Sequence, residues 1–182
     1  DPDFETFRAQ VEQAHARGLR AAVHIFNLED AQMAVDAGVD VIGHSVRDQD
    51  VTPAFIASLT ERGVPYVPTL TRDLSIFVYE STPSFFMDPF FLRGRSLYDE
   101  QVPALSEPAY QRRVREDRNA QAIKQALEQA ERNLRLLSEA GVTIAMGTDS
   151  GAAGSPGRWQ GYFEHVELAM MVEAGMTPMQ VL

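Results

Sequence analysis

The sequence contains no cysteine, which excludes disulfide bridges, thiolate zinc sites and cysteine nucleophiles. Basic residues are also few, because 16 lysines and arginines face 26 aspartates and glutamates, for a formal net charge of -10. Such a surface repels a phosphate backbone, so nucleic acid is not an expected partner. No apolar stretch reaches the roughly 18 residues that a membrane span needs. We therefore expect a soluble globular protein that does not bind membranes, either cytoplasmic or exported.

Recognised phosphate-binding and nucleophile motifs are missing as well. The most glycine-rich segment, GTDSGAAGSPG at 147–157, has neither the G-x-G-x-x-G spacing nor a G-K-[ST] sequence. It also differs from the G-x-S-x-G turn of serine hydrolases, because its central residue is Asp149 and Ser150 follows. The sequence therefore disfavours nucleotide binding and serine hydrolysis.

A repeated unit of helix, glycine and strand is present instead. Four largely apolar runs follow such glycines, at 19–24, 39–44, 64–70 and 142–149. They do not alternate between apolar and polar residues, which is typical of parallel strands covered on both faces by helices. Helices are predicted between the runs, at Leu28–Ala37, at Thr52–Arg62 and over a long segment that ends near Ala140.

Strands that alternate with helices predict an α/β fold, either part of a doubly wound sheet or half of an eight-stranded barrel. Because no phosphate motif supports the first, we predict a partial (β/α)8 TIM-type barrel in a single domain over 1–182. A segment at about 72–115 interrupts the pattern with prolines and clustered aromatic residues. We interpret it as an inserted lid or binding loop, with packing against an adjacent surface as the alternative.

Three of the four predicted strands end in a side chain that can bind a metal ion, namely His24, His44 and Asp149. The carboxyl ends of parallel strands open onto one face of a barrel, so we expect these three side chains to converge. Imidazole and carboxylate together suit zinc, with manganese, nickel and iron as alternatives. A lone histidine at a strand end is more often a hydrogen-bonded core residue, but two at equivalent positions favour metal binding. His15 and His165 lie in helical patterns; we interpret His15 as structural and leave His165 open.

Four stretches carry a resemblance to a known family: AAVHIFNLEDAQMAVDAGVDVIGHS, GVPYVPTLT, AGVTIAMGTDSG and GYFEHVELAMMVEAGMTPMQVL. They resemble the second half of the amidohydrolase superfamily, in its imidazolonepropionase-like and Xaa-Pro-dipeptidase-like branch. The resemblance implies a distorted (β/α)8 barrel in which His24 closes the fifth strand, His44 the sixth and Asp149 the eighth. The chain would then contribute about strands 5 to 8 with their helices.

The resemblance also implies roles. His24 and His44 would bind the more exposed of two metal ions, and Asp149 would touch the buried ion and take a proton from the attacking water. Where a single metal is used, His44 would instead contact substrate. The reaction would be hydrolysis of a C–N bond in a small amide, cyclic amide or dipeptide, since a divalent ion acidifies a bound water and a neighbouring carboxylate accepts its proton.

The departures from the family pattern matter equally. The H-x-H pair of the first strand and the lysine of the fourth are absent, and the only lysine, Lys124, lies in an amphipathic helix. We therefore expect the chain to be incomplete alone, as a truncated reading frame, a processed piece or a fragment that pairs with another chain. Self-association or the missing half of the barrel is the expected partner. A non-catalytic half-barrel, with both histidines packed in the core, is the alternative function.

Three further side chains, Arg72, Tyr79 and Arg158, are candidates for contacting a substrate carboxylate. Surface ion pairing is the commoner role of such residues, so the sequence does not rank them.

Overall fold

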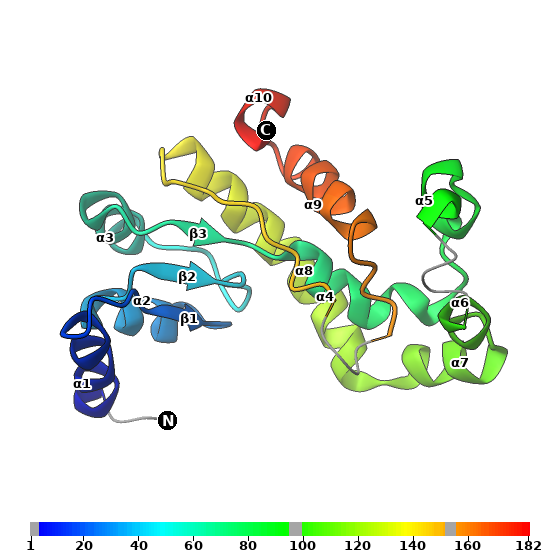
Figure 1. The fold of residues 1–182 in the computed structure, drawn as a ribbon, viewed down its shortest axis with the longest axis horizontal. Helices are drawn as coiled ribbons and strands as arrows, with labels where there is room; N and C mark the ends of the chain where they lie inside the picture. The colour runs from blue at the N-terminus through cyan, green and yellow to red at the C-terminus, as the bar shows by residue number, and fades with distance from the viewer. Residues whose placement is uncertain (1–3, 95–99, 152–155) are drawn as a thin grey trace.

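The computed structural model describes residues 4–94, 100–151 and 156–182. Its first part alternates helices with strands: α1 (Phe4–His15), β1 (Ala22–His24), α2 (Leu28–Ala37), β2 (Val41–Gly43), α3 (Pro53–Arg62) and β3 (Tyr66–Val67). The strands form a parallel sheet in the order β1-β2-β3, near α1, α2 and α3 (Figure 1). The fold is therefore α/β, as the sequence predicts.

Local signals in the sequence set the bounds of α2 and α3. The hydroxyl of Thr52 accepts a hydrogen bond from the N–H of Phe55, so Thr52 caps α3 and Pro53 occupies its first turn. Gly38 and Gly63 end α2 and α3 with positive φ angles of 94° and 64°, which a residue without Cβ adopts at little cost. The predicted bounds of both helices are confirmed.

The fourth predicted strand, at 142–149, forms only an isolated parallel bridge between Tyr66 and Ile144. The run lies beside β3 in the expected direction, but the prediction of a full strand is wrong. Tyr66 bonds to the fourth run through its N–H and its carbonyl, and the next residue on the same side of β3 is Pro68, which has no N–H to extend the ladder. The fourth run is therefore paired through Tyr66 alone.

The rest of the chain is helical. It comprises α4 (Leu70–Phe77), η1 (Val78–Glu80), η2 (Ser84–Met87), α5 (Pro89–Gly94), α6 (Gln101–Leu105), α7 (Pro108–Glu116), α8 (Arg118–Glu139), α9 (Tyr162–Glu173) and α10 (Pro178–Val181). The segment 72–115, interpreted above as an inserted loop, is folded over much of its described length into these short helices. Its prolines and Gly94 break the helices into pieces too short to show a clear period in the sequence.

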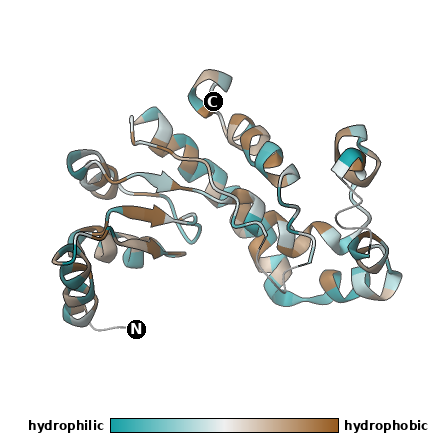
Figure 2. Ribbon diagram, in the orientation of Figure 1, coloured by the Kyte–Doolittle hydropathy of each residue, from teal (hydrophilic) through white to brown (hydrophobic). Residues whose placement is uncertain are grey.

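Three hydrophobic clusters support this arrangement. The first joins the sheet to α2 and α3, the second lies between α4, α8 and α9, and the third is an aromatic group around Trp159. Figure 2 shows the brown, hydrophobic strands β1 and β2 towards one end of the molecule and the helices α5, α6 and α7 at the other. No helix among the described residues is both long and apolar enough to cross a bilayer.

Candidate functional site

The two strand-end histidines contact each other directly. His24 is the last residue of β1 and His44 follows the last residue of β2, so parallel pairing brings the two side chains together. The Nδ1 atom of His24 lies 2.6 Å from the Nε2 atom of His44, and the ring centroids are 4.7 Å apart. His24 is exposed and His44 is buried. The predicted approach of these two residues is therefore present.

Thr69 orients the ring of His44. Its Oγ1 atom lies 2.7 Å from Nδ1 of His44, so the opposite nitrogen, Nε2, points towards His24. A hydrogen bond to the outer nitrogen is the usual way in which proteins fix the tautomer and orientation of a metal-binding imidazole. The alternative of two packed core histidines requires hydrogen bonds from the imidazoles to backbone carbonyls. In the described part of the chain, neither imidazole of the pair makes such a bond.

The backbone at the strand ends is strained. Among the described residues, only three that are not glycine have positive φ: His44 at 73°, Thr69 at 49° and Asp149 at 52°. Each lies where a predicted strand ends, in a conformation that costs a side-chain-bearing residue about 1–2 kcal/mol. Such strain persists where the surrounding structure holds it, and it often marks functional sites.

The electrostatic surroundings keep His44 neutral. Burial, the largest cause, and the neighbouring imidazole of His24 lower the pKa of His44 to about 4, although the carboxylate of Asp149 opposes the shift. At pH 7 the ring is therefore uncharged, which is the form that binds a metal ion.

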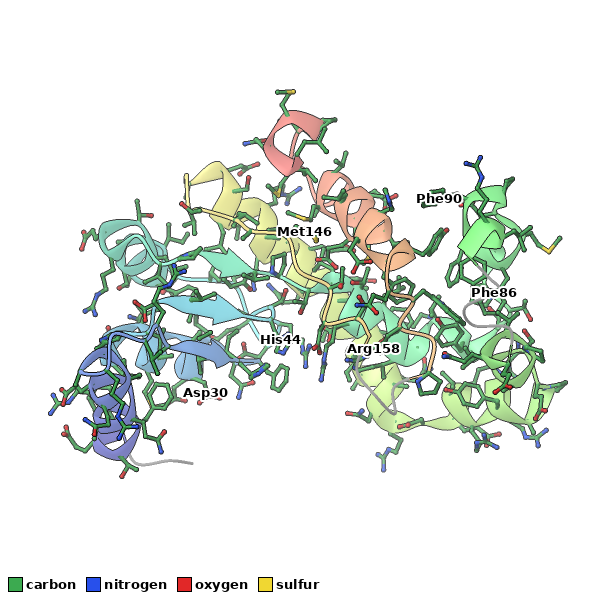
Figure 3. All side chains as sticks on the ribbon, in the orientation of Figure 1. Asp30, His44, Phe86, Phe90, Met146 and Arg158 are labelled. Carbon is green, nitrogen blue, oxygen red and sulfur yellow. The ribbon has the colours of Figure 1, made fainter. Side chains whose placement is uncertain are left out.

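Asp149 lies near this pair but is engaged elsewhere. Its Oδ2 atom is 3.0 Å from Nη1 of Arg158, and the same nitrogen donates to the Asp149 carbonyl at 3.1 Å. The side chain of Asp149 is 38% exposed. Figure 3 shows Arg158 and His44 both in the central part of the molecule. Among residues 4–94, 100–151 and 156–182, no three histidine, aspartate or glutamate side chains form a ready metal site. Convergence of all three predicted ligands therefore stays a prediction.

A charged and aromatic cluster borders the histidines. The ring of Phe26 stacks on His44 with centroids 5.7 Å apart, and the guanidinium groups of Arg47 and Arg72 lie 4.3 and 5.1 Å from its centroid. Both arginines bind the buried carboxylate of Asp73. Two cations thus share one anion beside the candidate site.

A buried carboxylate fixes the loop that carries Thr69. Glu167 on α9 accepts hydrogen bonds from the backbone N–H groups of Leu70 and Thr71, at 2.8 and 2.7 Å, and from the Thr71 hydroxyl at 2.7 Å. The Thr71 hydroxyl also lies 3.4 Å from the carbonyl of Thr148. Burial raises the pKa of Glu167 to about 7, although these hydrogen bonds act in the opposite direction. Glu167 therefore anchors the residues that directly follow Thr69, and Thr71 links them to the end of the fourth run.

Sequence reasoning missed these supporting residues. Thr69 lies at the end of the third apolar run, and that position was its only signal; nothing in the sequence pairs Glu167 with a loop nearly a hundred residues away. Of the two helical histidines, His15 contacts Asp40 at 2.9 Å and the exposed His165 makes an edge contact with Phe90. These contacts agree with a structural role for His15 and assign no function to His165.

Comparisons with known proteins support the fold more than the activity. No protein-family model matches the chain. A segment of 66 residues is 35% identical to an uncharacterized protein of Mycobacterium tuberculosis, which corresponds to 36% of this chain and 17% of that protein. The chain therefore matches a small part of the curated relative.

Solved structures match nearly the whole chain. A Xaa-Pro dipeptidase with methionine bound in its active site has a TM-score of 0.65 and 24% identity, over 98% of this chain and 35% of that one. The Aspergillus niger ochratoxinase has a TM-score of 0.60 and 24% identity, over 98% and 31%. A bottromycin amidohydrolase has a TM-score of 0.60 and 18% identity, over 98% and 41%. The chain thus spans about 31 to 41% of the length of these proteins, and over that part it shares their fold.

Proposed function

We propose that this chain supplies about strands 5 to 8 of a metal-dependent amidohydrolase barrel that hydrolyses C–N bonds in amides, cyclic amides or dipeptides. The observation that carries the proposal is the contact between His24 and His44 at the ends of neighbouring parallel strands. The fold shared with dipeptidases and amidohydrolases supports the same reaction class. Because the chain covers 35% of the dipeptidase, the activity is proposed for the whole enzyme rather than for this part alone.

The donor types at these strand ends, two imidazoles and a carboxylate, suit a divalent metal ion, with zinc as the first choice. His24 and His44 present inward nitrogens to each other, and Thr69 holds the outer nitrogen of His44. Asp149 would be the third ligand from this chain. A bound metal ion supplies an acidified water and polarises the scissile carbonyl.

Other residues of this chain would have separate roles in hydrolysis. His44 stays neutral because it is buried, so it remains a ligand or a substrate contact at pH 7. Asp149 would bind the metal ion with one carboxylate oxygen and accept a proton from water with the other, so the contact of Oδ2 with Arg158 would be released when the ion binds. Phe26 and the two arginines would form one wall of the substrate site.

The test is hydrolysis of dipeptides and N-acyl amino acids by the longest natural chain that contains this sequence, with its zinc content measured. Asp149→Asn should lower kcat by about 10²–10⁴-fold, as loss of a general base does, while the protein stays folded. Asp36→Asn, an exposed aspartate on α2, is the matched control and should keep full activity.

Two results would contradict the proposal. One is hydrolysis that survives Asp149→Asn unchanged. The other is a purified protein that binds no divalent ion, or whose hydrolysis is unaffected when its metal is removed.

A further inference from the structure

The guanidinium group of Arg72 is only partly used by the protein. Its Nη1 atom donates to Oδ1 of Asp73 at 2.7 Å. Its Nε atom is buried and has no hydrogen-bond partner among the described residues. The hydrogen bond of this guanidinium within the same part of the chain comes from Nη1, so Nη2 is not used there. A buried donor without an acceptor is unfavourable, so this edge of the side chain calls for an anion or another acceptor.

The unused atoms form a complete recognition edge. Nε–H and Nη2–H point in parallel from one side of a guanidinium, and this fork matches the two oxygens of a carboxylate. The charge balance agrees, because Arg47 and Arg72 share the single buried carboxylate of Asp73, which leaves one positive charge uncompensated in that cluster. The local excess is notable in a chain whose net charge is -10.

The position of Arg72 places this fork at the candidate site. Its guanidinium lies 5.1 Å from the centroid of Phe26, and the same ring stacks on His44. Phe26 is itself 38% exposed, so a ligand can reach the ring that joins the two groups.

The structure separates Arg72 from the two other candidates for this contact. Tyr79 is buried, and its hydroxyl donates to the carbonyl of Gly157 and accepts from Nε1 of Trp159. Arg158 is engaged with Asp149. Of the three, Arg72 is the one with a buried donor, Nε, that has no acceptor among the described residues.

We propose that Arg72 binds the carboxylate of the substrate through Nε and Nη2, beside the His24–His44 pair, while Asp73 holds the guanidinium in place. The inference deepens the proposed function and rests on it for the identity of the ligand. It makes a free carboxylate, next to an amide bond, the feature that this site selects. Arg72 is therefore a specificity-determining residue.

Binding of a matched ligand pair tests this without any hydrolysis. N-acetyl-L-methionine and its uncharged carboxamide differ only in the carboxylate, and methionine occupies the active site of the similar Xaa-Pro dipeptidase. Calorimetric titration of each ligand into the protein, in buffer freed of metals by a chelating resin, gives two dissociation constants. We expect the carboxylate to bind at least about tenfold more tightly than the amide.

Three variants test whether the preference for the carboxylate depends on Arg72. Arg72→Gln should abolish the preference for the carboxylate. Arg72→Lys keeps the charge but loses the fork, so it should retain only part of the preference and guards against a folding defect in the first variant. Arg112→Gln removes an equal charge from an exposed position on α7 and should leave the preference unchanged.

The inference is overturned if the wild-type protein binds neither ligand or does not distinguish them, or if Arg72→Gln and Arg112→Gln behave alike. Because the assay uses no metal and no turnover, its outcome is separate from that of Asp149→Asn. Arg72-dependent binding without hydrolysis would remove the proposed reaction alone. Metal-dependent hydrolysis with no effect of Arg72 would remove the carboxylate site alone.

Discussion

Replacing Glu167 with glutamine should lower the free energy of unfolding by about 1–3 kcal/mol, the usual cost of leaving a buried hydrogen-bonding group without its partner. Glutamine has nearly the same shape, but it places an NH2 group where one carboxylate oxygen accepts bonds from Thr71. The backbone N–H of Thr71 would then face another donor. Glu167 is 0% exposed, so water cannot easily take over the missing acceptor.

Urea denaturation followed by circular dichroism measures this cost. Glu173→Gln is the matched control, because it makes the same change on the same helix, α9, at an exposed position. Its effect should stay within about 0.5 kcal/mol. If Glu167→Gln is no more destabilising than this control, the carboxylate does not hold α4 to α9 as described.

The pH dependence gives a second test of the same side chain. Burial raises the pKa of Glu167 from an ordinary 4.5 to about 7, so between these values the folded chain holds a proton that the unfolded chain has released. The resulting stabilisation is complete below about pH 4.5 and is lost as the pH rises through about 7. The advantage of the wild-type protein over Glu167→Gln should therefore shrink across this interval. An advantage that grows with pH would refute the reasoning.

Two other substitutions test the packing around the site. Gly157→Ala should destabilise the fold by at least about 2 kcal/mol, because its φ is 80° and an added Cβ would lie 2.5 Å from the ring of Tyr79. Gly63→Ala, also at positive φ but with nothing within 4 Å, should cost only the strain of about 1–2 kcal/mol, and equal losses in thermal melts would contradict the difference. Asn133→Ala should cost about 1–3 kcal/mol in urea denaturation, since this buried amide accepts from the N–H of Val51 and donates to two carbonyls of the loop after β2. An unchanged midpoint would show that the loop is held by other contacts.

Local patterns predicted the elements that the sequence alone determines. The cap at Thr52 and the glycines after α2 and α3 define helix ends through neighbouring residues, so their prediction needs no tertiary information. The same holds for the approach of His24 and His44, because the ends of successive parallel strands lie side by side, although the register pairs His24 with Gly43. These predictions are confirmed.

Features that depend on distant contacts were not predictable in the same way. The fourth run is apolar like the others, but Pro68 prevents its ladder with β3 from continuing beyond the bridge at Tyr66. The orientation of His44 depends on Thr69, and the loop of Thr69 depends on Glu167, which follows it by 98 positions. Nor does the sequence reveal that Arg158 pairs with Asp149, since nothing in it fixes which of several neighbouring charges meet.

The positive φ angles of His44, Thr69 and Asp149 have a consequence for how these positions should vary among related sequences. Glycine at any of the three positions would relieve the local strain, so stability by itself pushes these positions towards glycine in every generation. In relatives with a working site, selection for function should keep the imidazole, hydroxyl and carboxylate in spite of this strain. Relatives with glycine at two or three of these positions should be those that have given up the chemistry and kept the scaffold.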